Sequence, residues 1–178
     1  MTYGSYPDLR EVKKILVIKL RQLGDVLLTG PVFSALKGAL PGAKIDAYVY
    51  TEAFPMLEGH PGVDGLVGYE RGRGGLRQEW ELWRRIRGAG YDLAINLTEG
   101  DRGALAARVS GAGIRVGFEP KGRWQRGWYT HVVKGCPGLR HTVERNLDAL
   151  RRIGIFPEPS GWILVIEARS CGHLAAHH

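Results

Sequence analysis

The sequence predicts an α/β fold, a parallel sheet with helices on both faces. Short apolar runs that suit strands alternate along the chain with longer amphipathic segments that suit helices, as in repeated βαβ units. The run from Ile15 to Ile18 is continuously apolar and mostly β-branched, which is typical of a central strand buried on both faces. Turns rich in Gly and Pro, at 41–42, 59–62, 72–75 and 88–90, separate the segments.

Each element is placed by its own pattern of apolar residues. We expect strands near Lys14–Leu20, Lys44–Tyr50, Gly65–Tyr69, Tyr91–Leu97, Ile114–Phe118 and Thr130–Val133. We expect helices near Asp25–Leu40, Gly75–Arg87, Gly103–Ser110 and Thr142–Ile153.

Pro31 leaves two possibilities for the first helix. Val32, Phe33 and Leu36 follow a spacing that faces a sheet. Proline is tolerated in the first turn of a helix but breaks or kinks its interior. Either the helix begins at Asp25 and bends, or an irregular turn precedes a helix that begins near Gly30.

The composition is that of a soluble globular domain, with 44% hydrophobic and 24% charged residues, and it disfavours intrinsic disorder. No apolar run approaches the ~20 residues that span a bilayer, and the polar N-terminus lacks the apolar core of a signal peptide. We therefore expect a cytoplasmic location. The two cysteines, Cys136 and Cys171, are too far apart in the chain to indicate a zinc site or a disulfide framework.

The net charge of +7 indicates an acidic partner. The arginines between 77 and 87 are typical of a solvated helix face. The loop from Lys121 to Trp128 instead alternates basic residues with tryptophans, which suits contact with phosphate together with a sugar or apolar surface. The alternative is a solvated loop whose tryptophans pack on the domain's own core. Nucleic-acid binding has only the charge in its favour, because no nucleic-acid-binding signature is present, and we do not expect it.

Asp25 is the candidate catalytic residue. It is the only carboxylate in the first strand-to-helix loop, at the sheet edge where α/β proteins bind ligands. The alternative is that Asp25 caps the N-terminus of the helix, a position that aspartate favours. Lys19, Arg21 and Gln22 flank the same turn.

The segment Ile15–Leu40 resembles the N-terminal signature of the lipopolysaccharide heptosyltransferases, glycosyltransferase family 9. Further similar segments follow in the family's order: Tyr91–Thr98, Arg102–Ala107, Arg115–Phe118 and His141–Leu150. Lys19–Thr29 and Tyr50–Met56 are most similar to the heptosyltransferase III type. The resemblance covers about residues 13–157.

The resemblance implies a domain organisation. Residues 13–157 are expected to form a Rossmann-like acceptor-binding domain, equivalent to the N-terminal half of a GT-B glycosyltransferase, after an extension at 1–12. Residues 158–178 do not resemble the family's interdomain linker, so we expect a tail produced by truncation, frameshift or cloning. We expect the donor-binding domain to be missing and the chain to be inactive alone.

The resemblance also implies a reaction and a set of residues. The family transfers heptose from ADP-heptose to the lipopolysaccharide inner core at the inner face of the cytoplasmic membrane, without a metal or cofactor, and Asp25 matches its proposed base. A binding module for an anionic saccharide or nucleotide, and a basic nucleic-acid-binding domain, are the alternatives. The alternative to acceptor binding by Lys19 is that Lys19 merely ends its strand in solvent. The alternative for Arg102 is an ion pair with Asp101 or Glu99. The acceptor-binding residues implied are Lys19, Arg21, Gln22, Gly24, Arg102, Arg123 and Arg126.

Overall fold

The computed structural model describes residues 6–72, 75–119, 122, 127–134 and 141–157. Its six strands form one sheet in the order β3-β2-β1-β4-β5-β6, and every neighbouring pair is parallel. The chain order changes direction at β1, which lies between β2 and β4. The strands are β1 (Lys14–Lys19), β2 (Lys44–Tyr50), β3 (Gly65–Tyr69), β4 (Leu93–Asn96), β5 (Ile114–Phe118) and β6 (His131–Val133).

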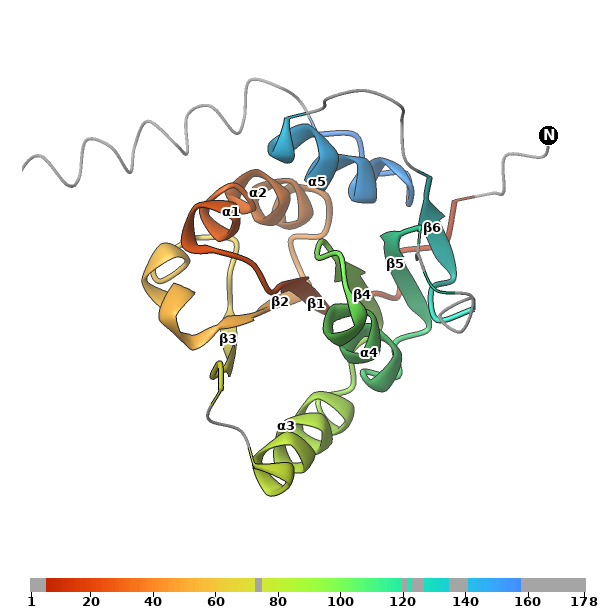
Figure 1. The fold of residues 1–178 in the computed structure, drawn as a ribbon. Helices are drawn as coiled ribbons and strands as arrows, with labels where there is room; N and C mark the ends of the chain where they lie inside the picture. Colours follow the sequence, from red (N-terminus) through yellow and green to blue (C-terminus); the bar gives the residue numbers. More distant parts are fainter. Residues whose placement is uncertain (1–5, 73–74, 120–121, 123–126, 135–140, 158–178) are drawn as a thin grey trace, which may run out of the picture.

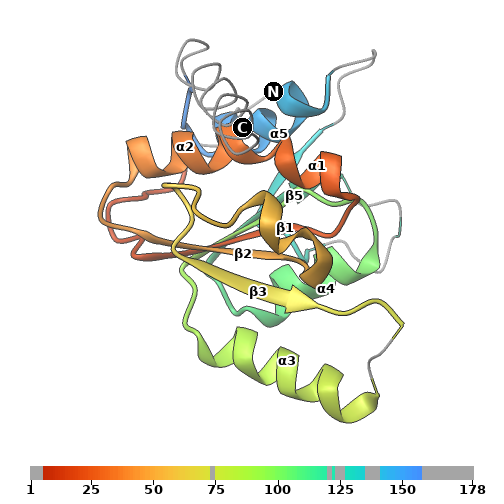
Figure 2. The same cartoon turned by 90° about the vertical axis from the view of Figure 1, so that its left-hand side faces the viewer.

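Helices cover both faces of the sheet, which confirms the predicted fold class (Figures 1 and 2). The α1, α2 and α5 helices lie over one face, and α3 and α4 lie over the other. None of the helices in the described ranges combines the length and apolar composition that crossing a bilayer requires. The helices are α1 (Leu23–Leu27), α2 (Gly30–Ala39), the 3₁₀ helix η1 (Thr51–Met56), α3 (Leu76–Gly88), α4 (Asp101–Val109) and α5 (Thr142–Arg151).

The core lies on both sides of β1. Ile15 and Val17 pack toward α2 and α5, whereas Leu16 and Ile18 pack toward α3 and α4. All four side chains are fully buried, as the continuous apolar run predicts. This burial fixes the position of the loop that follows β1.

The single helix predicted over 25–40 is wrong, because the segment forms two helices. The α2 helix begins at Gly30, so that Pro31 occupies the first turn, where its missing N–H costs nothing. The preceding residues form the short helix α1 rather than an irregular turn. The sequence prediction also missed η1, whereas the bounds of the other predicted elements agree with the structure to within two residues.

Candidate functional site

The candidate site lies where the loops after β1 and β4 meet under α5. These two strands flank the point at which the strand order reverses, and open α/β sheets bind ligands outside the carboxyl ends of such strands. A cavity of about 360 Å³ opens there and is called the first cavity below. Its lining residues are Arg21, Thr98, Glu99, Gly100, Asp101, Ala104, Phe118, Glu119, Gly122, Tyr129 and Arg145.

Lys19 ends β1 with its side chain buried, being only 5% exposed. Its ammonium donates hydrogen bonds of 3.1 Å to the Leu97 carbonyl and of 3.1 Å to Oδ1 of Asn146. The alternative in which Lys19 ends its strand in solvent is therefore wrong. A buried ammonium with two neutral acceptors is costly to keep charged, because hydrogen bonds replace only part of its hydration.

Charged neighbours of Lys19 define the site further. Burial lowers the pKa of Lys19 to about 8, while the Asp25 carboxylate acts against this shift and the Arg21 guanidinium acts with it. Arg21 and Asp25 follow Lys19 in the chain, in the loop and the short helix after β1. The structure thus brings together Lys19, Arg21 and Asp25, three of the predicted site residues.

Asp25 does not cap α1. The N-cap residue is Gln22, and Asp25 lies in the first turn with its side chain half-buried. Within the described part of the chain, no hydrogen bond or ion pair engages the Asp25 carboxylate. The N-cap position predicted by this alternative is therefore wrong, whereas its charge argument holds, because Asp25 lies in the first turn, where the helix dipole favours a carboxylate.

Arg21, Gln22 and Gly24 lie exposed around this turn, and Arg21 lines the first cavity. A Cβ atom at Gly24 would meet nothing within 4 Å, so the fold does not require glycine there. Open space beside Asp25 is what an incoming substrate needs.

Asn146 joins α5 to the loop after β1 and was not predicted. A continuous helix would pair the Val32 N–H with the Leu28 carbonyl, but that N–H donates instead to Thr29 at 2.9 Å. The freed Leu28 carbonyl accepts a hydrogen bond of 3.3 Å from Nδ2 of Asn146, whose Oδ1 binds Lys19. The side-chain amide of Asn146 thus hydrogen-bonds both to the backbone at the break between α1 and α2 and to the Lys19 ammonium.

Arg145 was also missed. Its guanidinium pairs with the Glu99 carboxylate and lies 4.6 Å from the centre of the Phe118 ring. All three residues line the first cavity. Arg145 and Glu99 are 46 positions apart, and no local pattern in the sequence links them.

The loop after β4 is held by a buried chain of hydrogen bonds. The Leu20 N–H donates to the Thr98 hydroxyl at 2.7 Å, and the Thr98 N–H donates to Oδ1 of Asn96 at 3.0 Å. Nδ2 of Asn96 in turn donates to the Tyr129 hydroxyl at 2.7 Å. The next turn needs glycine, because Gly100 has φ +119° and ψ 168°, a conformation essentially reserved for glycine.

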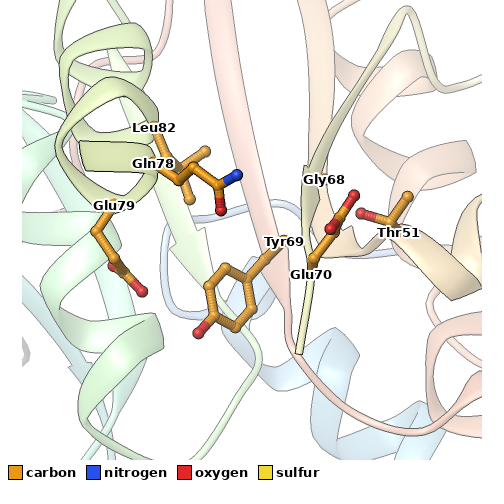
Figure 3. Close-up of a pocket in the computed structure, with 7 residues that line it drawn as sticks. All are labelled: Thr51, Gly68, Tyr69, Glu70, Gln78, Glu79 and Leu82. Carbon is orange, nitrogen blue, oxygen red and sulfur yellow. The ribbon is translucent and has the colours of Figure 1, made fainter. Parts of the chain in front are cut away.

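Arg102 lies away from the first cavity. It donates hydrogen bonds of 2.8 and 3.0 Å to the two carboxylate oxygens of Glu79, so the alternative of an ion pair with Asp101 or Glu99 is wrong. Its guanidinium also lies 4.0 Å from the centre of the Tyr69 ring. Glu79 and Tyr69 line a second cavity, of about 220 Å³, between β3 and α3 (Figure 3). Arg123 and Arg126 lie outside the described residues.

No group of three or more His, Cys, Asp or Glu side chains in the described ranges is placed to hold a metal ion. What the site presents is a half-buried carboxylate with no hydrogen-bond partner among the described residues, a buried lysine, and a cavity lined by two arginines and three carboxylates. This set suits proton transfer beside a ligand that an arginine can contact.

Known proteins are similar to this chain in sequence and in fold. The profile of glycosyltransferase family 9 (heptosyltransferase) matches residues 79–169. This range includes part of the segment predicted to be a tail, and the predicted domain division stays a prediction. Two curated relatives, both named lipopolysaccharide heptosyltransferase 3, come from Escherichia coli: one, from strain K12, is 35% identical over 146 residues, and the other is 32% identical over 143.

The relatives are longer than this chain. The matched regions cover 76% of this chain but 41% and 42% of the two relatives, so the chain spans about two fifths of their length. A solved family 9 glycosyltransferase of Veillonella parvula has a TM-score of 0.73 at 25% identity, covering 85% of this chain and 43% of that one. The Escherichia coli heptosyltransferase WaaC with ADP has a TM-score of 0.68 at 19% identity, covering 82% and 49%. The fold therefore corresponds to one half of a GT-B heptosyltransferase, and the chain belongs to glycosyltransferase family 9, the heptosyltransferase family.

Proposed function

We propose that this chain supplies the acceptor site and the general base of an enzyme that transfers heptose from ADP-heptose to a heptose of the lipopolysaccharide inner core. Membership of family 9 and two relatives named lipopolysaccharide heptosyltransferase 3 support the reaction and the subgroup. The observation that carries the proposal is the Asp25 carboxylate, which lies beside Lys19 at the switch point of the sheet.

In this reaction the acceptor hydroxyl oxygen forms a bond to C1 of the heptose. The bond between C1 and the phosphate oxygen breaks, and ADP leaves with the electron pair. Asp25 takes the hydroxyl proton. A carboxylate is a sufficient base here, because glycosyl transfer passes through a transition state in which C1 carries positive charge and makes the attacking hydroxyl more acidic.

The first cavity offers two arginines to an anionic acceptor, alongside the carboxylates of Glu99, Asp101 and Glu119. Arg21 is exposed at the rim, and the Arg145 guanidinium is held beside the Phe118 ring. Guanidinium groups bind phosphate and carboxylate through paired hydrogen bonds. Acceptor contacts by Lys19, Arg21, Gln22, Gly24, Arg102, Arg123 and Arg126 stay part of the proposal.

The test is Asp25→Asn in a protein that carries both halves of the family's fold. We expect turnover to fall by about 10²- to 10⁴-fold, as for loss of a general base, with little change in melting temperature. Glu11→Gln is the matched control, because Glu11 is exposed and lies just before β1, at the amino ends of the strands, whereas Asp25 lies beyond their carboxyl ends. Turnover close to that of the control would contradict the role of Asp25.

For the 178-residue chain itself, we expect no heptose transfer and weak or no ADP binding. A titration with core oligosaccharide, ADP and a random RNA oligomer separates this proposal from its two rivals. Binding of the oligosaccharide alone is expected. Micromolar ADP binding would favour a nucleotide-binding module, and tight RNA binding would favour a nucleic-acid-binding domain.

A further inference from the structure

The second cavity combines residue types that recognise an uncharged sugar. Figure 3 shows Gln78, Glu79 and Leu82 of α3 on one side, Thr51, Gly68 and Glu70 on the other, and the Tyr69 ring between them. Tyr69, Leu82 and Gly68 give an apolar surface, and the other four give hydrogen-bonding groups. Aromatic rings that contact C–H groups, next to planar amide and carboxylate groups that bind hydroxyls, match the two kinds of surface on a pyranose.

Arg102 does not line the cavity but contacts two residues that do, Glu79 and Tyr69. Each Glu79 carboxylate oxygen accepts one N–H from Arg102, and the Tyr69 hydroxyl and the Trp83 indole N–H also hydrogen-bond to this carboxylate. Glu79 is therefore fixed in the cavity wall, and Thr51, Glu70 and Gln78 are the lining residues left to bind ligand hydroxyls. The same guanidinium lies over the Tyr69 ring, so one residue fixes both a polar and an aromatic part of the lining. The lining is thus held in place before any ligand arrives, which lowers the entropic cost of binding.

Charge and size restrict the ligand. Glu70 is exposed and has no ion pair among the described residues, and Glu79 adds a second carboxylate that only Arg102 balances. A phosphate or a uronic acid would be repelled from this lining. The volume of about 220 Å³ is below the roughly 300–1,000 Å³ typical of pockets for drug-sized ligands, so one sugar ring is the fitting occupant.

The two cavities lie on either side of the first turn of α4. Asp101 and Ala104 line the first cavity, whereas Arg102 turns toward the second. We propose that the second cavity is a binding subsite for an uncharged pyranose of the acceptor glycan, separate from the first cavity. This inference rests on the proposed function, because a glycan acceptor is what brings a further sugar to this edge of the sheet.

The test is an NMR titration of the 178-residue chain with methyl α-D-mannopyranoside, with methyl glucuronide and glucosamine as charged probes. We expect shifts of the backbone amides at β3 and at the start of α3 with the neutral sugar. Gln78→Ala should weaken this binding by about three- to tenfold, the effect of losing one hydrogen bond. Glu81→Gln is the control on the same helix, because Glu81 bonds to Arg77 at 3.0 Å and does not line the cavity.

Circular dichroism confirms that each variant folds. The inference is overturned if the neutral sugar shifts no amide at β3 or α3, if Gln78→Ala binds as the control does, or if glucosamine binds better and loses that advantage in Glu70→Gln. The proposed role of Asp25 is tested separately by Asp25→Asn in the protein with both halves, so near-control turnover there, together with sugar binding at β3 and α3, would refute the role of Asp25 and retain the subsite.

Discussion

At the scale of single residues, Lys19 is the group around which the candidate site is organised. It is a charged side chain in an apolar layer, with the Leu97 carbonyl and the Asn146 amide as its hydrogen-bond partners. The Asp25 carboxylate opposes the effect of burial on the pKa of Lys19. The protonation of Lys19 therefore depends both on its burial in the folded domain and on the charge of Asp25, the candidate base.

This burial predicts a pH dependence of stability. The folded chain holds the pKa of Lys19 at about 8, against an ordinary value of 10.5. Below about pH 8 the lysine is protonated in both the folded and the unfolded chain and contributes no slope. Between these two values the unfolded chain binds more protons, so the free energy of unfolding rises with pH, by about 3 kcal/mol over the whole interval.

Urea unfolding of the wild type and of Lys19→Met at a series of pH values measures this effect. The difference between the two free energies isolates Lys19 from the tyrosines, which also titrate at high pH. We expect the difference to change in favour of the wild type as the pH rises from about 8 toward 10. Parallel curves would mean that the lysine is not buried as a charged group.

Sequence reasoning predicts residues that follow a recognisable strand and misses those that arrive from elsewhere in the chain. Asp25 and Lys19 could be predicted because they end or follow the apolar run of β1. Arg145 and Asn146 could not, because α5 reaches the site only through packing on the sheet. Sequence patterns report the face of a helix, not the distant loop that it covers.

At the scale of elements, the break between α1 and α2 shapes the site. Pro31 requires α2 to start at Gly30, which leaves the Leu28 carbonyl for Asn146 and turns α1 toward the ligand side of β1. The sequence showed that Pro31 interrupts the helix, but it did not show that the residues before Pro31 are themselves helical. The 3₁₀ helix η1 was missed because six residues with Pro55 inside give no helical periodicity.

The contact between α4 and β4 gives a prediction in which two effects oppose each other. Gly103 lies inside α4, where alanine would be favoured by about 1 kcal/mol in helix propensity. A Cβ atom there would lie 2.5 Å from Oδ1 of Asn96, which is buried and bonded to Thr98 and Tyr129. We expect the clash to prevail, so that Gly103→Ala lowers the free energy of unfolding by about 1–3 kcal/mol.

Thermal unfolding of Gly103→Ala measures that loss. Gly38→Ala is the control, because it makes the same change inside α2 at a position where a Cβ atom meets nothing within 4 Å. The control should gain stability from helix propensity. If both variants gained stability, the close packing of α4 on Asn96 would be refuted.

At the scale of the whole molecule, the surface has two chemically different regions, the first cavity and the outer side of α3. The first cavity carries two arginines and three carboxylates at the carboxyl ends of the strands, and the outer side of α3 exposes basic residues together with apolar ones. From the sequence alone, the arginines of this helix are typical of a solvated face. The structure adds that Leu76 is 91% exposed and Trp80 is 66% exposed, one helical turn apart.

The basic loop 121–128 is described only in part. Its residue Trp128 is half-buried against the core beside α3 and α4, as the alternative for that loop expects. For the same reason Trp128 is poorly placed to enter a membrane. Whether Arg123 and Arg126 contribute to binding an anionic acceptor or surface stays a prediction, testable with their double substitution by Ala.

We expect α3 to provide the contact with an anionic membrane surface. Leu76 and Trp80 can enter the headgroup region, where tryptophan is favoured, while Arg84 and Arg85 remain exposed beside them for lipid phosphates. Arg77 contributes less, because Glu81 already pairs with it at 3.0 Å. Each free cation near such a surface adds about 1 kcal/mol of attraction at low salt, and salt screens it.

Co-sedimentation with phosphatidylglycerol vesicles tests this expectation. The double variant Leu76→Ser/Trp80→Ser should bind about tenfold more weakly than the wild type, because the apolar contact is lost while the net charge of +7 is kept. Its remaining binding should disappear as salt rises. Leu27→Ser removes an exposed leucine, 45% exposed, from α1 on the opposite face of the sheet and should bind like the wild type. Equal binding by the wild type and the double variant at every salt concentration would show that α3 does not contact the membrane.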